Sequence, residues 1–90
     1  VSNIVKIRRG SIGDARKRFD VVVANIDLRR LRRMRRSLLH HVKSKGFLIL
    51  SGILEGEKER TLRYYKETRL LKWAKATQEG EWVCLTFKRK

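Results

Sequence analysis

One stretch of sequence decides the fold, and it reads FDVVVANI at residues 19–26. This continuous, β-branched apolar run is typical of a strand that is buried on both faces and lies in a parallel sheet. A helix is expected next, because Asp27 can cap it and apolar residues recur at helical spacing over residues 28–42. A second buried run follows at residues 47–50 and continues into residues 51–54. Strand, helix and strand with short connections predict a right-handed parallel crossover.

The flanking segments extend this unit in both directions. The helix is expected to cover residues 28–44 and to end at Gly46 in a left-handed turn. Residues 4–8 predict a short strand, and residues 10–18 predict a polar loop or a single helical turn. Further along, we expect a helix over residues 56–69, strands over 70–77 and 81–88, and a hairpin turn at 78–80. The whole pattern predicts three α/β layers ending in an antiparallel pair.

Length and composition narrow the class of protein. Ninety residues leave room for one domain, residues 1–90, and an apolar share of 41% is typical of a globular chain. No apolar run approaches the roughly 18 residues of a membrane span. A lone cysteine excludes an internal disulfide and a cysteine-rich zinc site. We expect a cytoplasmic domain without a metal site or a membrane segment.

The positive charge is uneven along the chain. The net charge is +15, and the first 46 residues carry 14 basic and 3 acidic side chains. Such a balance favours a polyanion such as RNA, or an anionic surface, through counterion release. A solvated face on a very basic protein explains the same pattern, so both interpretations stay open. The arginines expected to contact nucleic acid are Arg29, Arg32, Arg33 and Arg36.

Candidate site residues lie where the expected strands end, because open α/β sheets bind ligands at the carboxyl ends of their strands. Asn25 is the sharpest candidate, since a polar side chain follows an apolar run there and its carbonyl oxygen could orient an amine or a hydroxyl. Ser51 and Gly52 follow the next strand, and Ser11 follows the short first strand. The alternative is that Asn25 only shapes the strand-to-helix turn and that Ser51 and Gly52 only form a tight turn.

The other chemically active side chains are expected to have structural roles. His40 and His41 have no partner at ligand spacing, so we expect both on the surface. Cys84 lies mid-strand among apolar residues and is expected in the core, and Trp82 is expected to pack against the sheet or a helix. No carboxylate pair is spaced for acid–base catalysis.

Three blocks of sequence together resemble a known family. The segments at residues 19–26, 47–54 and 80–85 are similar, in order and spacing, to motifs of the methyltransferases that act on ribosomal protein eleven of the large subunit. The likeness covers about residues 19–88, with a weaker likeness at 3–11. It implies the C-terminal half of a class I S-adenosylmethionine-dependent methyltransferase. The implied fold is α/β, with a Rossmann-like partial parallel sheet flanked by helices and ending in an antiparallel hairpin.

The resemblance also implies a reaction and the residues that serve it. The family trimethylates protein amines by direct transfer from the sulfonium of S-adenosylmethionine, and its substrate is a ribosomal protein. By this likeness Asn25 holds the target nitrogen with Ile26 beside it. Ser51 and Gly52 are expected on the substrate side because they follow the next strand. The residues assigned to the cofactor are Ser11 and Ala24.

The chain departs from the family's pattern at several positions, and these departures change what we expect of its activity. The glycine-rich cofactor loop and the ribose-binding acidic residue of the family would both precede Val1. Ser11 stands where the family has an acidic residue, and KSKG at 43–46 replaces the usual Lys-Pro-Gly-Gly. We therefore expect no activity without the cofactor-binding half. The alternative is a basic RNA- or ribosome-binding module derived from the same fold.

In the family, the glycine-rich loop and the acidic residue belong to two strands that would also precede Val1, and this creates a problem of sheet pairing. In the family these two strands separate the strand at 3–9 from the strand at 20–24, so the latter would have an unpaired edge here. Unpaired edges invite pairing with another segment or chain. Either residues 3–9 cover this edge or a second copy does, so we expect a rearranged sheet or a homodimer.

Overall fold

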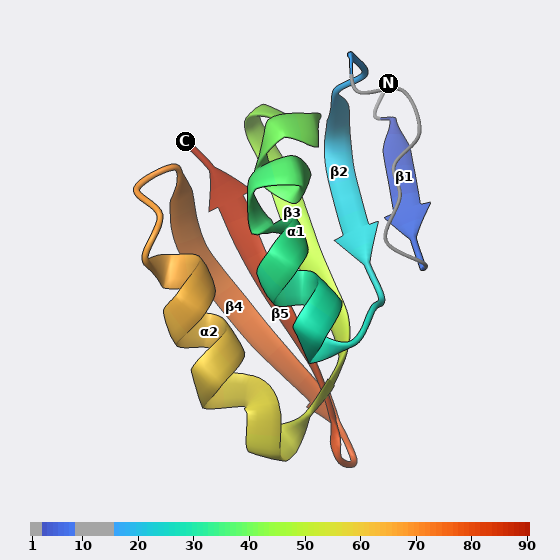
Figure 1. The fold of residues 1–90 in the computed structure, drawn as a ribbon, viewed down its shortest axis with the longest axis vertical. Helices are drawn as coiled ribbons and strands as arrows, with labels where there is room; N and C mark the ends of the chain where they lie inside the picture. The colour runs from blue at the N-terminus through green and yellow to red at the C-terminus, as the bar shows by residue number, and fades with distance from the viewer. Residues whose placement is uncertain (1–2, 9–15) are drawn as a thin grey trace.

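The computed structural model describes residues 3–8 and 16–90, and its strands form one sheet with the order β1-β2-β3-β5-β4 (Figure 1). Strands β1, β2 and β3 are parallel, whereas β5 runs antiparallel to both β3 and β4. The strands are β1 (Ile4–Ile7), β2 (Phe19–Ala24), β3 (Val42–Leu54), β4 (Leu71–Glu79) and β5 (Trp82–Arg89). The helices are α1 (Leu28–His41) and α2 (Lys58–Lys66), with a short 3-10 turn at Glu55–Glu57 before α2.

The central unit of the sheet confirms the prediction from residues 19–54. Strand β2, helix α1 and strand β3 form a parallel crossover, and β2 pairs with β3 in the register Val22↔Leu48 and Ala24↔Leu50. Asp27 caps α1, since its carboxylate accepts a hydrogen bond of 2.9 Å from the backbone N–H of Arg30. The α/β class and the closing antiparallel hairpin are confirmed as well.

The end of helix α1 differs from the prediction. The helix stops at His41 instead of residue 44, and β3 begins at once with Val42. The positive φ belongs to Lys45, at 67°, and not to Gly46. A Cβ on Gly46 would lie 2.6 Å from the carbonyl oxygen of Asp20 and 2.9 Å from that of Lys43. Glycine is therefore needed for the close approach of β2 and β3, and not for ending the helix.

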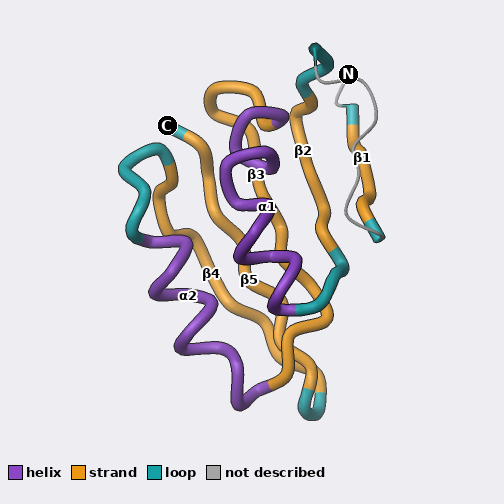
Figure 2. Tube along the Cα trace, viewed as in Figure 1, coloured by secondary structure: helices purple, strands orange, loops and turns teal. Residues whose placement is uncertain are grey.

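Both helices cover the same face of the sheet, as Figures 1 and 2 show, so the described part of the chain has two layers instead of the expected three.

Two tyrosines of α2 join the helices to each other. The Tyr65 hydroxyl donates a hydrogen bond to the carbonyl of Leu31, and the Tyr64 hydroxyl donates one of 3.0 Å to that of Arg32. Burial of Tyr65 raises the pKa of its hydroxyl, with Tyr64 adding to the rise and Arg35 opposing it, so Tyr65 remains a donor.

The hydrophobic core lies between the helices and the covered face of the sheet. Side chains alternate along each strand, so alternate residues are buried over residues 22–24 of β2, 46–50 of β3 and 83–87 of β5. The buried sheet residues include Val22, Ala24, Leu48, Leu50, Ile53, Val83, Leu85 and Phe87, which pack against Leu31, Leu38, Leu39 and Tyr65 of the helices. The opposite face stays partly exposed at Val21, Val23, Ile49, Cys84 and Thr86.

Strand β1 covers the edge of β2 that the sequence leaves without a partner. The two strands pair in parallel, from Ile4↔Val21 to Ile7↔Ala24. Asn3 fixes the start of the pair, because its backbone carbonyl accepts a hydrogen bond of 3.1 Å from the Asp20 N–H. The rearranged sheet is thus the alternative that the structure adopts. The homodimer stays a prediction. Its original reason, an unpaired edge of β2, no longer holds because β1 pairs with that edge.

Several expected placements are wrong or only partly met. His41 is buried, at 5% exposed, and its Nδ1–H donates a hydrogen bond of 2.7 Å to the carbonyl of Ser37. Trp82 is 52% exposed instead of packed against the sheet, and Cys84 is half-buried. His40 is exposed, as expected. Within residues 3–8 and 16–90, neither helix has the length and apolar character needed to cross a membrane.

Candidate functional site

Asn25 and Gly52 meet at the carboxyl ends of two neighbouring parallel strands. Asn25 directly follows β2, and the pairing of Ala24 with Leu50 brings it beside Ser51 and Gly52 of β3. A Cβ built on Gly52 would overlap Asn25 Oδ1 and would lie 3.3 Å from Asn25 Cγ. The side-chain amide of Asn25 therefore rests directly on the Gly52 backbone, and the structure brings together residues that the sequence predicts at this edge.

The surrounding backbone holds this contact in place. The N–H of Asn25 donates a hydrogen bond of 2.8 Å to the carbonyl of Ile7, so the end of β1 supports the end of β2. Gly52 adopts a φ of +76°, in the region that favours glycine, at an irregularity of the β3–β5 pairing between Leu50 and Ile53. The side chain of Asn25 is exposed and has no hydrogen-bond partner among the described residues, which leaves its amide open to a ligand.

Beside this contact lies a hollow of about 240 Å³ between the end of β3 and the hairpin of β4 and β5. Ser51 and Gly52 form the β3 side of the hollow. The hairpin side consists of Thr77, Gln78, Glu79, Trp82, Val83 and Cys84. None of these hairpin residues was predicted as part of a site. The sequence block at 80–85, which resembles the family's motif, could have pointed to Trp82, Val83 and Cys84, whereas no sequence signal marks Thr77, Gln78 and Glu79.

The remaining predicted site residues contribute differently. The side chains of Ala24 and Ile26 are buried in the hydrophobic core. They anchor the backbone on both sides of Asn25 and do not face a ligand at the carboxyl ends of the strands. Ser11 lies outside the described residues. Within the described ranges, no three His, Cys, Asp or Glu side chains come together as metal ligands. The amide of Asn25 is thus the exposed polar group that directly follows β2, and the polar side chains of the neighbouring hollow lie beside it.

The arginines of α1 are arranged as the sequence predicts. Arg29, Arg32, Arg33 and Arg36 are exposed and form no ion pair with another described residue. The two other arginines of the run are engaged. Arg30 lies 3.8 Å from the carboxylate of Asp27, and Arg35 lies 3.1 Å from that of Glu67.

The fold and this edge define a class of protein, the Rossmann-like methyltransferases. The ribosomal protein L11 methylase of Lactobacillus delbrueckii subsp. bulgaricus superposes with a TM-score of 0.77 at 26% identity, covering 90% of this chain and 42% of that one. The N-methyltransferase NodS of Bradyrhizobium japonicum WM9 superposes with a TM-score of 0.62 at 12% identity, covering 87% of this chain and 55% of that one, and shares the fold alone.

The family itself follows from the sequence comparisons. The family model described as "Ribosomal protein L11 methyltransferase (PrmA)" matches residues 1–90, so the chain belongs to the ribosomal protein L11 methyltransferase family. The enzyme of Campylobacter fetus subsp. fetus is 44% identical over 81 residues, which cover 90% of this chain and 28% of the relative. That of Geobacter metallireducens is 41% identical over 76 residues, which cover 84% and 25%. The chain thus spans little more than a quarter of these relatives.

Proposed function

We propose that this chain forms the acceptor side of a methyltransferase that transfers methyl groups from S-adenosylmethionine to amines of ribosomal protein L11 in the cytoplasm. The observation that carries the proposal is the contact between Asn25 and Gly52, which presents an exposed amide at the carboxyl edge of the parallel strands. This is the edge at which open α/β sheets bind their ligands. The membership in the family supplies the reaction class.

In this proposal Asn25 positions the nitrogen that receives the methyl group. Its Oδ1 accepts a hydrogen bond from the neutral amine, which turns the nitrogen lone pair toward the methyl donor. A fixed orientation of this kind supplies a large share of a rate enhancement, because the reacting atoms need not search for their geometry. The support from Gly52 and from the Ile7 carbonyl holds the amide in that position.

We propose that residues outside this chain hold most of S-adenosylmethionine. Of the two residues assigned to the cofactor, Ala24 has a buried side chain and Ser11 lies outside the described part. Neither residue therefore presents a described side chain to the cofactor. When bound, the cofactor would supply an electrophilic methyl group, and the chain alone would be inactive.

A chimera tests this proposal. The matching segment of the Campylobacter fetus enzyme is replaced by the 90 residues of this chain, and methylation of ribosomal protein L11 is followed by mass spectrometry. We expect the chimera to methylate the protein, because the chain supplies the acceptor edge. A chimera that folds cooperatively and binds S-adenosylmethionine, yet transfers no methyl group, would overturn the proposal.

Calorimetry tests the proposed division of the cofactor site. Titration of the 90-residue chain alone with S-adenosylmethionine, and then with S-adenosylhomocysteine, is expected to show no saturable binding. Saturable binding to the chain alone would show that it holds a complete cofactor site, and the proposed division would then be wrong.

We propose RNA or ribosome binding as a second function of the same chain. This function is favoured by four exposed arginines of α1 that form no ion pair with another described residue. They are Arg29, Arg32, Arg33 and Arg36. Arginine side chains neutralise phosphates and release counterions, which drives binding at low salt. A second copy of the chain is a further proposed partner, and the mass of the chain in solution tests it.

A further inference from the structure

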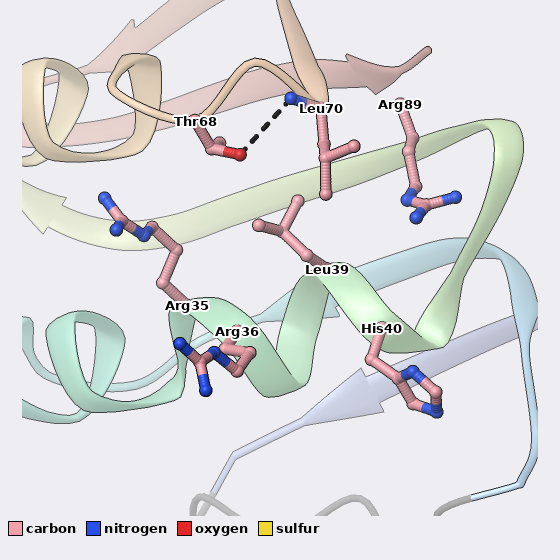
Figure 3. A pocket seen from close by; sticks show the side chains of 7 residues that line it. All are labelled: Arg35, Arg36, Leu39, His40, Thr68, Leu70 and Arg89. Atoms are coloured by element: carbon pink, nitrogen blue, oxygen red, sulfur yellow. Dashed lines mark hydrogen bonds between the residues drawn. The ribbon is translucent and has the colours of Figure 1, made fainter.

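A basic hollow lies at the end of the sheet opposite Asn25, between the last turns of α1, the connection from α2 to β4, and the end of β5 (Figures 1 and 3). Its volume is about 340 Å³. Leu39 and Leu70 face each other in its middle, and Thr68 accepts a hydrogen bond of 3.2 Å from the Leu70 N–H (Figure 3). The other lining residues are basic: Arg35, Arg36, His40 and Arg89.

Two of these arginines are available to an anion. Arg36 is exposed and forms no ion pair with a described residue. Arg89 is half-buried, and its Nε is buried without a hydrogen-bond partner in the described structure. An N–H group that loses water without gaining an acceptor costs free energy, which an incoming anion oxygen would recover. The Arg89 Nε therefore points to a ligand with acceptor oxygens.

Arg35 links this hollow to a second basic hollow between the two helices. Its Nη1 donates hydrogen bonds of 2.6 Å to the Tyr64 carbonyl and 3.1 Å to Glu67, and its guanidinium lies 4.0 Å from the centre of the Tyr64 ring. Tyr64 and Glu67 also line the second hollow. The residues that complete it are Leu28, Arg32, Arg60 and Arg63. The two hollows thus adjoin each other on either side of Arg35, and we call their combined lining the arginine groove.

The arginine groove carries a large excess of positive charge. Its lining includes a single carboxylate, that of Glu67, which is already paired with Arg35. The arginines that remain come from three elements that are distant in sequence: Arg32 and Arg36 of α1, Arg60 and Arg63 of α2, and Arg89 of β5. By contrast, Arg29 and Arg33 line a separate hollow together with Arg30, Asp27 and Glu57, so two carboxylates stand beside three guanidinium groups there.

We propose that the arginine groove binds the phosphate backbone of RNA, which rests on the second function proposed above and gives it a defined surface. Helix α1 has 14 residues, and at about 1.5 Å per residue it presents charge over roughly 21 Å, a length that suits a polymer with regularly spaced anions. Guanidinium groups match phosphate oxygens in pairs. The centres of protein–protein interfaces are poor in charged residues, whereas nucleic-acid interfaces are strongly positive.

The groove is expected to read the backbone and not the bases. Its tyrosine ring, that of Tyr64, is already covered by the guanidinium of Arg35 and approached by Arg32 at 5.4 Å. Its other ring, that of His40, packs edge-on against His41 at 5.1 Å, and the lining contains no phenylalanine or tryptophan on which a base could stack. Contacts to phosphates position a nucleic acid without reading its sequence. Binding should therefore depend strongly on salt and weakly on sequence.

Paired substitutions in the 90-residue chain test the proposal. The groove variants are Arg36→Gln with Arg89→Gln, and Arg60→Gln with Arg63→Gln. The matched control is Lys72→Gln with Lys75→Gln, which removes two positive charges at exposed positions of β4 that line neither hollow. Binding of a fluorescein-labelled single-stranded RNA is measured by anisotropy over a series of salt concentrations, and circular dichroism checks the fold of each variant.

We expect each groove variant to bind RNA about 10- to 100-fold more weakly, with the slope of log K against log salt reduced by roughly 0.7 for each phosphate that is no longer neutralised. The control variant should bind within about threefold of the unsubstituted chain. Equal losses in all three variants would show that net charge alone drives binding, and would overturn the groove. Displacement of the RNA by polyglutamate at equal charge would identify an acidic protein segment as the better partner.

The results of these experiments also distinguish a failure of the groove proposal from a failure of the RNA-binding or methyltransferase proposals. A chain that binds no RNA at low salt contradicts the second function itself. RNA binding that survives in both groove variants contradicts only the groove. Methyl transfer by the chimera is measured without RNA, so neither outcome bears on the methyltransferase proposal.

Discussion

Replacing Gly46 with alanine is expected to lower the free energy of unfolding by about 3 kcal/mol, the upper part of the range for overpacking a closed site. The new Cβ would lie 2.6 Å from the Asp20 carbonyl oxygen and 2.9 Å from that of Lys43. Both obstacles are backbone atoms, so no side-chain rotation relieves them. Strand β3 would have to move away from β2 at the start of their parallel pairing. Urea unfolding followed by circular dichroism measures the loss.

Gly56→Ala is the matched control for this prediction. A Cβ on Gly56 has no neighbour within 4 Å, and its φ is not positive. The substitution is expected to change stability by less than about 1 kcal/mol, since it adds no clash and reduces the freedom of the unfolded chain. Equal stability of Gly46→Ala and Gly56→Ala would mean that β2 and β3 do not approach as closely at Gly46 as the structure indicates.

Gly46 also illustrates where sequence reasoning stops. A glycine after an amphipathic run is typical of a helix end, and nothing local distinguishes that role from a close approach of two strands. The oxygen that excludes a side chain at Gly46 belongs to Asp20, which lies 26 residues earlier in the chain. By contrast, the start of α1 was predictable, because the Asp27 cap and its Arg30 partner are three residues apart.

The number of layers depends on contacts that are equally distant in sequence. The amphipathic pattern of α1 and α2 predicts that each helix covers the sheet, but not which face it covers. Both helices share one face, where the hydroxyls of Tyr64 and Tyr65 bond to carbonyls of α1 more than 30 residues away. The pairing of β1 with β2 is likewise a choice between two alternatives that local sequence leaves open.

The candidate sites also contain some residues that the local sequence predicts and others that only tertiary packing brings together. Asn25 and Gly52 were predictable, because each comes shortly after an apolar run and parallel strands end at one edge, although Gly52 lies inside β3 and not after it. The arginine groove was only half predictable. Arg32 and Arg36 belong to the conspicuous run on α1, whereas Arg60, Arg63 and Arg89 join them only through the packing of α2 and β5. A count of charges along the sequence does not reveal that convergence.

In the chimera with the Campylobacter fetus enzyme, Asn25→Ala is expected to lower kcat for methylation of ribosomal protein L11 about 100-fold. The reason is that the acceptor nitrogen loses the group that orients its lone pair, and misplacement by about 1 Å can cost that much. The side chain of Asn25 is exposed and has no hydrogen-bond partner among the described residues, so its removal should leave the fold intact. Calorimetry should show unchanged affinity for S-adenosylmethionine.

Gly52→Ala should reproduce part of this loss without touching Asn25 itself. The new methyl group would overlap Asn25 Oδ1 and push the amide away from its support, so kcat should fall about tenfold. Alanine at the φ of +76° also costs about 1–2 kcal/mol of stability. Gly80→Ala is the control, because its φ of +61° carries the same backbone cost while a Cβ there has no neighbour within 4 Å.

The three variants together separate positioning from stability. If Asn25 positions the acceptor, kcat falls in Asn25→Ala and in Gly52→Ala, while Gly80→Ala keeps its activity at a similar loss of stability. Full activity in Asn25→Ala would show that its amide only shapes the turn between β2 and α1. An equal fall in Gly52→Ala and Gly80→Ala would show that backbone strain, and not the displaced amide, limits the reaction.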